Sequence, residues 1–286
     1  MTDIETDDAA ERTDETGGFA FTASVGVAVL VGAALGITAR LGAVDLLIAV
    51  AVVQALTALT VAYGFQLPGR KGAMVLAALA AAGADVVVSV WPHSQLGTLL
   101  PVLGLAVPLL IAHQLMRGAA RVRVLESLGG AAILVIAVVA LPALVQLRHE
   151  FVSTTTAGRV VFGVVLSIVA ALVVGFLTDL VVAVPRFDPA VPRGLVALLA
   201  SGIVGGLVGY LTLRDTTEFA GARGVFAGAS LGVLVGLVAI GVAFAEATTP
   251  PPEAAFSRRL RPALAVVLPV CVLAPVAFLL CLAIRV

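Results

Sequence analysis

Nine stretches of 18 or more mostly apolar residues, separated by short connections rich in Arg, Pro and Gly, dominate the sequence. A helical stretch of this length spans the hydrocarbon core of a bilayer, because each residue adds about 1.5 Å to an α-helix. The sequence therefore predicts an all-α fold, a polytopic transmembrane helical bundle of about nine membrane-spanning helices. The predicted spans are residues 19–38, 45–64, 73–91, 97–116, 128–147, 160–184, 194–213, 224–245 and 262–284.

The composition excludes most classes of soluble protein. Only 12% of the residues are charged and 61% are hydrophobic, whereas an average soluble domain has about 25% charged residues. The chain lacks the polar surface that a globule in water needs, so we exclude a soluble enzyme and a nucleic-acid-binding protein. The expected partner is the lipid bilayer, and no nucleic acid is expected.

Residues 1–18 differ from the rest of the chain. They contain seven acidic residues and one basic residue, Arg12, with few apolar side chains. Such a segment cannot bury enough apolar surface to fold, and it lacks the basic start and the cleavage site of a signal peptide. We therefore expect a disordered acidic cytoplasmic tail over residues 1–18 and a transmembrane helical domain over residues 19–286.

The distribution of Lys and Arg predicts the orientation in the membrane. With nine spans, eleven basic residues fall on the side of the N-terminus and six fall on the other side. Cytoplasmic loops carry the excess of basic residues. We therefore expect a multi-pass protein of the plasma membrane with a cytoplasmic N-terminus and an external C-terminus.

The longest cytoplasmic connection, residues 246–261, contains three consecutive prolines followed by a cluster of arginines. The prolines favour a stiff, extended chain. Arg258, Arg259 and Arg261 would lie at the level of anionic headgroups, where each basic residue contributes about 1 kcal/mol of membrane attraction. The cluster either sets the topology alone or also binds a lipid headgroup or a partner protein.

Small residues recur at four-residue spacing in three of the predicted spans. This spacing places them on one face of a helix, where a neighbouring backbone can approach closely. We expect them to pack helices within the chain, with a homodimer face as the alternative. The glycines are Gly32 and Gly36 in the first span, Gly205 and Gly209 in the seventh, and Gly228, Gly232 and Gly236 in the eighth.

Ionisable residues inside the spans are the best indicators of a functional site, because a charge at mid-bilayer costs at least about 2.5–3.5 kcal/mol. Asp85 lies within the third span and Asp179 near the cytoplasmic end of the sixth. Gln54 and His113 are candidate polar partners. Asp85 is either a hydrogen-bonded structural residue or a proton or solute site, whereas Asp179 can also pair with Arg186 at the interface.

Prolines inside the spans predict kinked helices, because each proline removes a backbone donor. Broken helices are common at the substrate sites of transporters, and kinks also serve ordinary packing. These prolines are Pro101, Pro108, Pro142, Pro269 and Pro275.

Motifs for catalysis and metal binding do not fit this chain. The segment 228–232 spells G-x-S-x-G, but it lies in the middle of a predicted helix rather than at a strand-to-helix turn. The two cysteines and three histidines have no ligand spacing. No catalytic residue, metal or cofactor is therefore expected.

Residue usage and three short segments carry a resemblance to known sequences. Arg outnumbers Lys sixteen to one, and the segments 67–71, 91–94 and 99–101 read Leu-Pro-Gly-Arg-Lys, Trp-Pro-His-Ser and Leu-Leu-Pro. Over about a third of its length, the chain resembles multi-spanning membrane proteins of actinobacterial type. The resemblance implies a helical membrane fold and no activity.

Three functional hypotheses remain open from the sequence. The first is a non-enzymatic scaffold or accessory protein with a membrane-protein partner or a second copy of itself. The second is a small-solute or proton-coupled transporter that uses Asp85 and Gln54. The third is a membrane enzyme that acts on lipid at the cytoplasmic face.

Overall fold

A computed structural model of the chain describes residues 3–92, 96–116, 123–182, 185–188, 191–219, 221–250 and 254–285. Within these residues, nine helical segments are long and apolar enough to cross a membrane. In lipid the backbone must satisfy its own hydrogen bonds, and a helix does so within one segment. The structure thus confirms the predicted all-α polytopic bundle, and the chain is an integral membrane protein.

The helices follow one another with short connections. They are α1 (Asp3–Leu41), α2 (Ala43–Gly64), α3 (Arg70–Val90), the 3₁₀-helix η1 (Leu96–Leu99), α4 (Leu100–Met116), α5 (Val124–Ala140), α6 (Ala143–His149), α7 (Thr154–Val181), α8 (Leu195–Leu213), α9 (Ala222–Thr248) and α10 (Ala255–Arg285). The fourth span combines η1 with α4, and the fifth combines α5 with α6.

A short antiparallel hairpin, which the sequence analysis did not predict, joins α7 to α8. Its strands are β1 (Arg186–Asp188) and β2 (Val191–Gly194), and they pair Arg186 with Gly194 and Asp188 with Val191. The hairpin therefore shortens the sixth span, which ends at Val181 rather than at residue 184.

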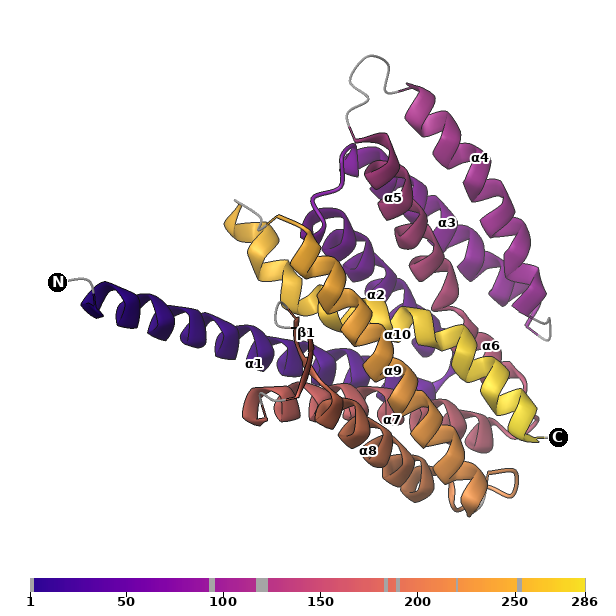
Figure 1. Cartoon of the computed structure of the whole chain (residues 1–286). Helices are drawn as coiled ribbons and strands as arrows, with labels where there is room; N and C mark the ends of the chain where they lie inside the picture. Colours follow the sequence, from indigo (N-terminus) through magenta and orange to yellow (C-terminus); the bar gives the residue numbers. More distant parts are fainter. Residues whose placement is uncertain are drawn as a thin grey trace.

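The first helix includes the acidic segment. α1 begins at Asp3, whereas its apolar span begins at Phe21. Figure 1 shows the N-terminal part of α1 projecting away from the bundle. A helical segment of this length that packs against no other helix is only marginally stable in water. The disorder expected for residues 1–18 therefore stays a prediction. Met1 and Thr2 lie outside the described residues.

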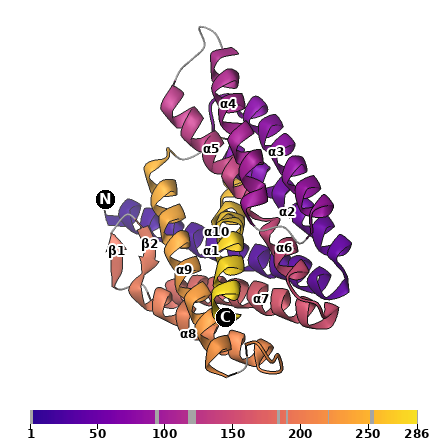
Figure 2. The ribbon, with the colours of Figure 1, turned by 90° about the vertical axis from the view of Figure 1, so that its right-hand side faces the viewer.

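The helices form two groups with α1 and α10 between them. The first group is α2–α6 and the second is α7–α9 (Figures 1 and 2). α1 contacts α2 and α7, while α10 contacts α2, α5 and α6 on one side and α7 and α9 on the other. The two groups are therefore joined largely through the first and the last helix.

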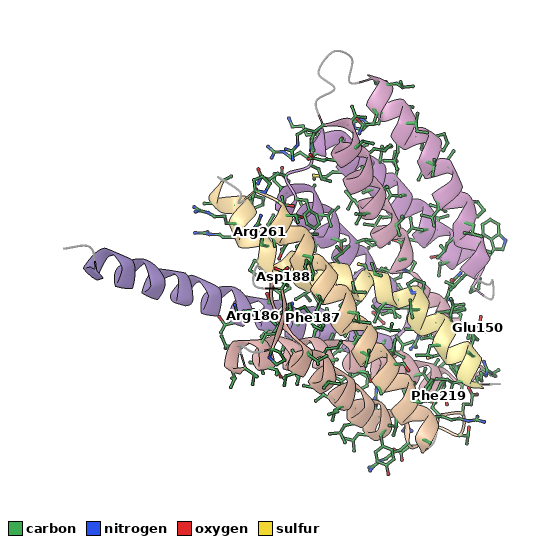
Figure 3. The ribbon with its side chains drawn as sticks, in the orientation of Figure 1. Glu150, Arg186, Phe187, Asp188, Phe219 and Arg261 are labelled. Atoms are coloured by element: carbon green, nitrogen blue, oxygen red, sulfur yellow. The ribbon has the colours of Figure 1, made fainter. Side chains whose placement is uncertain are left out.

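The bundle has two ends with different connections. The α2–α3, α7–α8 and α9–α10 connections lie at one end, here called the basic end, where Figure 3 labels Arg186 and Arg261. The α6–α7 and α8–α9 connections lie at the other, here called the C-terminal end, where Figure 3 labels Glu150 and Phe219. Membrane orientation stays a prediction, in which the basic end is cytoplasmic.

Burial varies strongly among the spans. In the most apolar window of the α7 span, 67% of the residues are buried, against 17% in the span formed by η1 and α4. Large apolar side chains point outward across the bundle, for example Leu30 at 71% and Ile203 at 72% exposure. Lipid tails solvate such side chains as well as a protein core does, so this surface fits a bilayer.

Candidate intramembrane polar sites

Gln54 joins three helices through one amide group. Its Nε2 atom donates a hydrogen bond to Oδ1 of Asp85 on α3 at 3.2 Å and another to the carbonyl oxygen of Val138 on α5 at 2.9 Å. Gln54 is 2% exposed, whereas Asp85 is half-buried. Both amide hydrogens of Gln54 are therefore used to hold α2, α3 and α5 together.

The Val138 carbonyl is available because of a proline. α5 ends at Ala140, a turn covers Leu141 and Pro142, and α6 begins at Ala143. Pro142 has no N–H group, so the carbonyl four residues earlier, at Val138, lacks its helical donor. Gln54 replaces that donor, which is how a neighbouring side chain makes a broken helix tolerable in a membrane.

Asp179 lies in a buried ion pair at the end of α7. Its Oδ2 is 3.2 Å from Nη1 of Arg193, and its Oδ1 accepts a hydrogen bond of 2.9 Å from the N–H of Gly194. The two charged side chains are 2% and 7% exposed. The guanidinium carbon of Arg193 also lies 4.3 Å from the centre of the Phe176 ring, a cation–π contact.

Strand β2 carries both groups that bind Asp179, so the hairpin positions this site. Burial lowers the pKa of Arg193, and the adjacent Asp179 carboxylate opposes that shift. Arginine stays protonated in proteins, and both oxygens of Asp179 have a donor. The site therefore favours a closed, structural ion pair.

The ion pair borders a small cavity. Its walls come from Asp179, Arg193 and Ser201 together with Gly175, Gly236 and apolar side chains of α8 and α9. The cavity measures about 10 Å³, which is the space of a single water molecule.

The glycines of α8 and α9 bring two backbones into contact. A Cβ atom on Gly205 would lie 3.0 Å from the Cα of Gly232, and one on Gly228 would lie 3.0 Å from the Cα of Gly209. Carbonyl oxygens of the facing helix would lie closer still. Such spacing allows dispersion and Cα–H···O contacts. Backbone cannot move aside as a flexible side chain can, so larger residues do not fit there.

The other predicted packing glycines also face helices of the same chain. A Cβ atom on Gly236 would lie 2.8 Å from Leu198 of α8. On α1, a Cβ atom at Gly32 would lie 2.7 Å from Val169, and one at Gly36 would lie 3.3 Å from Phe162. All seven predicted glycines therefore lie at contacts within the chain.

His113 does not reach Asp85. Its ring lies against Gly72 in the first turn of α3, thirteen residues before Asp85 and so about 20 Å away along the helix. The next residue, Gln114, donates a hydrogen bond of 2.6 Å to Ser127, which in turn donates to the Pro68 carbonyl at 2.7 Å. This end of α4 is thus tied to the α2–α3 connection.

Asp85 and Asp179 belong to separate sites. Asp85 lies among α2, α3 and α5, whereas Asp179 lies among α7, β2 and α8. The ion-pair partner of Asp179 is Arg193, where the sequence analysis named Arg186. A polar route that uses both carboxyl groups has no support in these contacts.

The arginine cluster lies in the first turns of α10. Arg258 and Arg259 are exposed and Arg261 is half-buried. Nη2 of Arg261 donates a hydrogen bond of 3.2 Å to the carbonyl of Pro250 at the end of α9. The three prolines that precede the cluster fall partly outside the described residues.

Two buried arginines were missed by the sequence analysis, which counted both as loop residues. Arg193 binds Asp179, and Arg148, at 8% exposure, donates from Nη1 to the carbonyl of Ala39 at the end of α1. Arg193 follows Asp179 by fourteen residues, but Arg186 is nearer in the sequence, so spacing alone does not select Arg193. Nothing in the sequence separates Arg148 from an ordinary loop residue.

Metal-binding chemistry has no support in the part of the chain that the structure describes. No group of three His, Cys, Asp or Glu side chains there is arranged to hold an ion. Cys271 and Cys281 are buried free thiols, and Sγ of Cys271 lies 3.3 Å from Oγ1 of Thr57.

Comparisons with known proteins add no relative. No family model matches the chain, and searches of curated proteins and of solved structures find no match. The resemblance to actinobacterial membrane proteins therefore stays an expectation, and the functional argument depends on the contacts described above.

Proposed function

We propose that this integral membrane protein is a non-enzymatic scaffold or accessory protein of the plasma membrane, with its basic end in the cytoplasm. One observation carries the proposal: the intramembrane candidates Asp179, Gln54 and Asp85 are bound by groups of the same chain. Asp179 is bound by Arg193 and Gly194, and Gln54 is bound to Asp85 and Val138. Polar groups that are used in this way contribute to stability and specificity rather than to chemistry.

The glycine contacts support the same proposal. The backbone-to-backbone contact of α8 and α9 holds these two helices together as one closely packed unit, as expected of a structural role. Its partner is proposed to be another membrane protein or a second copy of the chain, bound through the lipid-facing surface.

Reconstitution into proteoliposomes tests the scaffold proposal. We expect an imposed pH gradient to decay at the same rate with the wild type, with Asp85→Asn and in protein-free vesicles. Gly241→Leu serves as a folded control, because a side chain there meets no atom within 4 Å. A gradient that decays faster with the wild type, and not with Asp85→Asn, would overturn the proposal.

Proton-linked transport of a small solute at Gln54 and Asp85 is the second candidate. The observation in its favour is the half-buried state of Asp85 beside the interrupted helix α5–α6. Carbodiimide labelling of Asp85 in the bilayer, followed by mass spectrometry from about pH 5 to 9, separates the candidates. Labelling that varies with pH indicates an accessible, titrating carboxyl group, whereas a carboxyl group that stays unlabelled at every pH favours the scaffold.

A lipid-directed enzyme needs a cluster of carboxyl or imidazole groups near Arg258, Arg259 and Arg261. Among the described residues no such cluster of three occurs. This third hypothesis therefore has no observation to carry it.

A further inference from the structure

We propose that the α2–α3 and α9–α10 connections together form a binding surface for the headgroup of an anionic phospholipid. This headgroup surface consists of Tyr63, Arg70, Lys71, Phe256, Arg258 and Arg259. It extends the predicted arginine cluster across a second connection, and it holds whether the protein is a scaffold or a transporter.

The two connections are fixed to each other. The carbonyl oxygen of Pro250 accepts one hydrogen bond from Nε2 of Gln66 at 3.1 Å and another from Nη2 of Arg261 at 3.2 Å. Gln66 follows α2 and Arg261 lies in α10, so a single carbonyl joins both sides. The cations of the two connections are therefore held on one surface.

An aromatic stack orders the centre of this surface. The rings of Tyr63 and Phe256 meet edge to face with their centres 5.3 Å apart, and the guanidinium carbon of Arg70 lies 4.7 Å from the Tyr63 ring centre. Stacking on a ring restrains an arginine while its N–H groups remain free to bind an anion. The Arg70 side chain is thus already held in place before a phosphate binds.

Among the carboxylates whose side chains the structure describes, none neutralises the charge of this surface. Arg70, Lys71, Arg258 and Arg259 are all exposed, and none of these carboxylates forms an ion pair with any of the four. A phosphodiester fits this requirement, because guanidinium groups bind phosphate oxygens in pairs of parallel hydrogen bonds.

Two of the cations at the C-terminal end have carboxylate partners within the chain. Arg285 lies 3.1 Å from Glu218 and donates to the Glu150 carbonyl, and Arg214 lies 3.8 Å from Asp215. Basic residues that only set the membrane orientation need not be grouped around an aromatic stack. The grouping at the basic end therefore favours a binding role.

The position of the stack favours a lipid over a soluble anion. Tyr63 is in the last turn of α2, Arg70 begins α3 and Phe256 is the second residue of α10. Aromatic side chains at the ends of spans lie at the level of the headgroups. Phe256, at 55% exposure, would contact the glycerol and upper acyl chains while the four cations hold the phosphate.

Lipid retention by the purified full chain tests the surface. The protein is exchanged into nanodiscs that contain phosphatidylglycerol and phosphatidylcholine, and bound lipid is then counted by native mass spectrometry. We expect the wild type to retain phosphatidylglycerol preferentially. Since each cation contributes about 1 kcal/mol, or about 5-fold, Arg70→Gln with Arg258→Gln and Arg259→Gln should weaken retention on the order of 100-fold.

Matched variants separate an ordered site from charge alone. Arg214→Gln with Arg223→Gln removes two cations at the other end and should leave retention unchanged. Tyr63→Leu keeps every charge but frees Arg70, so retention should fall several-fold, whereas Tyr63→Phe keeps the ring and should retain the lipid. Thermal unfolding of each variant confirms that it remains folded.

Three outcomes would overturn the proposal. They are equal retention of the two lipids, wild-type retention by Tyr63→Leu, and displacement of the lipid by millimolar inorganic phosphate. The last result would assign the same cations to a free phosphate rather than to a lipid.

Discussion

Asp179 and Asp85 both lie in membrane-spanning helices, but their surroundings differ. Asp179 is fully buried and is bound by a guanidinium and a backbone N–H from one hairpin. Asp85 is half-buried and receives an amide hydrogen from Gln54. The first site compensates a full charge, which requires a paired cation in a medium of low polarity. The second joins helices through neutral donors, which is the weaker kind of interhelical bond.

The two regions also differ in how closely their helices approach. Around Asp179, α8 and α9 touch through glycine backbones. Around Asp85, α2, α3 and α5 are joined by the Gln54 amide at the Pro142 break. The comparison shows that close backbone packing joins α8 to α9, while a polar contact is added to the apolar packing of α2, α3 and α5.

The largest effect is expected at the α8–α9 contact. Gly228→Leu places a side chain against the backbone of Gly205 and Gly209, so the helices must separate. We expect a loss of at least about 4–5 kcal/mol, the range of exceptional substitutions, seen as a lower folded fraction in SDS titration. Gly241→Leu, on the same helix with open space, is the control and should change little. Equal behaviour of the two variants would contradict the packing argument.

The second-largest loss of stability is expected on removal of Arg193. Arg193→Ala leaves the Asp179 carboxylate buried without its cation, which typically costs about 3–5 kcal/mol. We expect the double variant Arg193→Ala with Asp179→Asn to recover part of that loss in the same titration. Arg186→Ala removes an exposed cation nearby and should cost less than about 1 kcal/mol. A larger loss for Arg186→Ala than for Arg193→Ala would show that the wrong partner has been assigned.

Removal of the Gln54 amide should have a moderate effect. Gln54→Leu leaves the buried Val138 carbonyl without a hydrogen-bond donor. We expect the free energy of unfolding to fall by about 1–3 kcal/mol. Pro142→Ala supplies a backbone N–H to the same carbonyl, so it should reduce the loss when combined with Gln54→Leu. If the second substitution gives no rescue, the freed carbonyl is not what Gln54 stabilises.

The smallest effect is expected for Asp85→Asn. The new side-chain carbonyl can still accept the hydrogen bond from Gln54, so the free energy of unfolding should change by less than about 1 kcal/mol. Asp85→Leu removes the acceptor and should cost more. If Asp85→Asn lowered the free energy of unfolding as much as Arg193→Ala does, the proposed difference between the Asp85 and Asp179 sites would be wrong.

The regular features of the fold were predictable because they are local in the sequence. Apolar runs mark the nine spans, four-residue spacing marks Gly228 and Gly232, and Gln54 was a candidate partner of Asp85 before any contact was known. The hairpin and Arg193 were missed, since their roles depend on how a short turn folds back onto α7. Apolar periodicity carries no information about such a turn.

The position of α10 between the two groups has a consequence for biosynthesis. α10 is the last of the described helices to leave the ribosome, yet it contacts both α2 and α9. Until it enters the membrane, the apolar faces that it will cover meet lipid, which is no less favourable than protein for them. The contact between Thr57 and Cys271 also forms only when α10 enters, although the Thr57 hydroxyl already donates to the Val53 carbonyl within α2. We therefore expect the α2–α6 and α7–α9 groups to be joined first through α1 and α6, and their packing to be completed only when the 31-residue helix α10 enters between them.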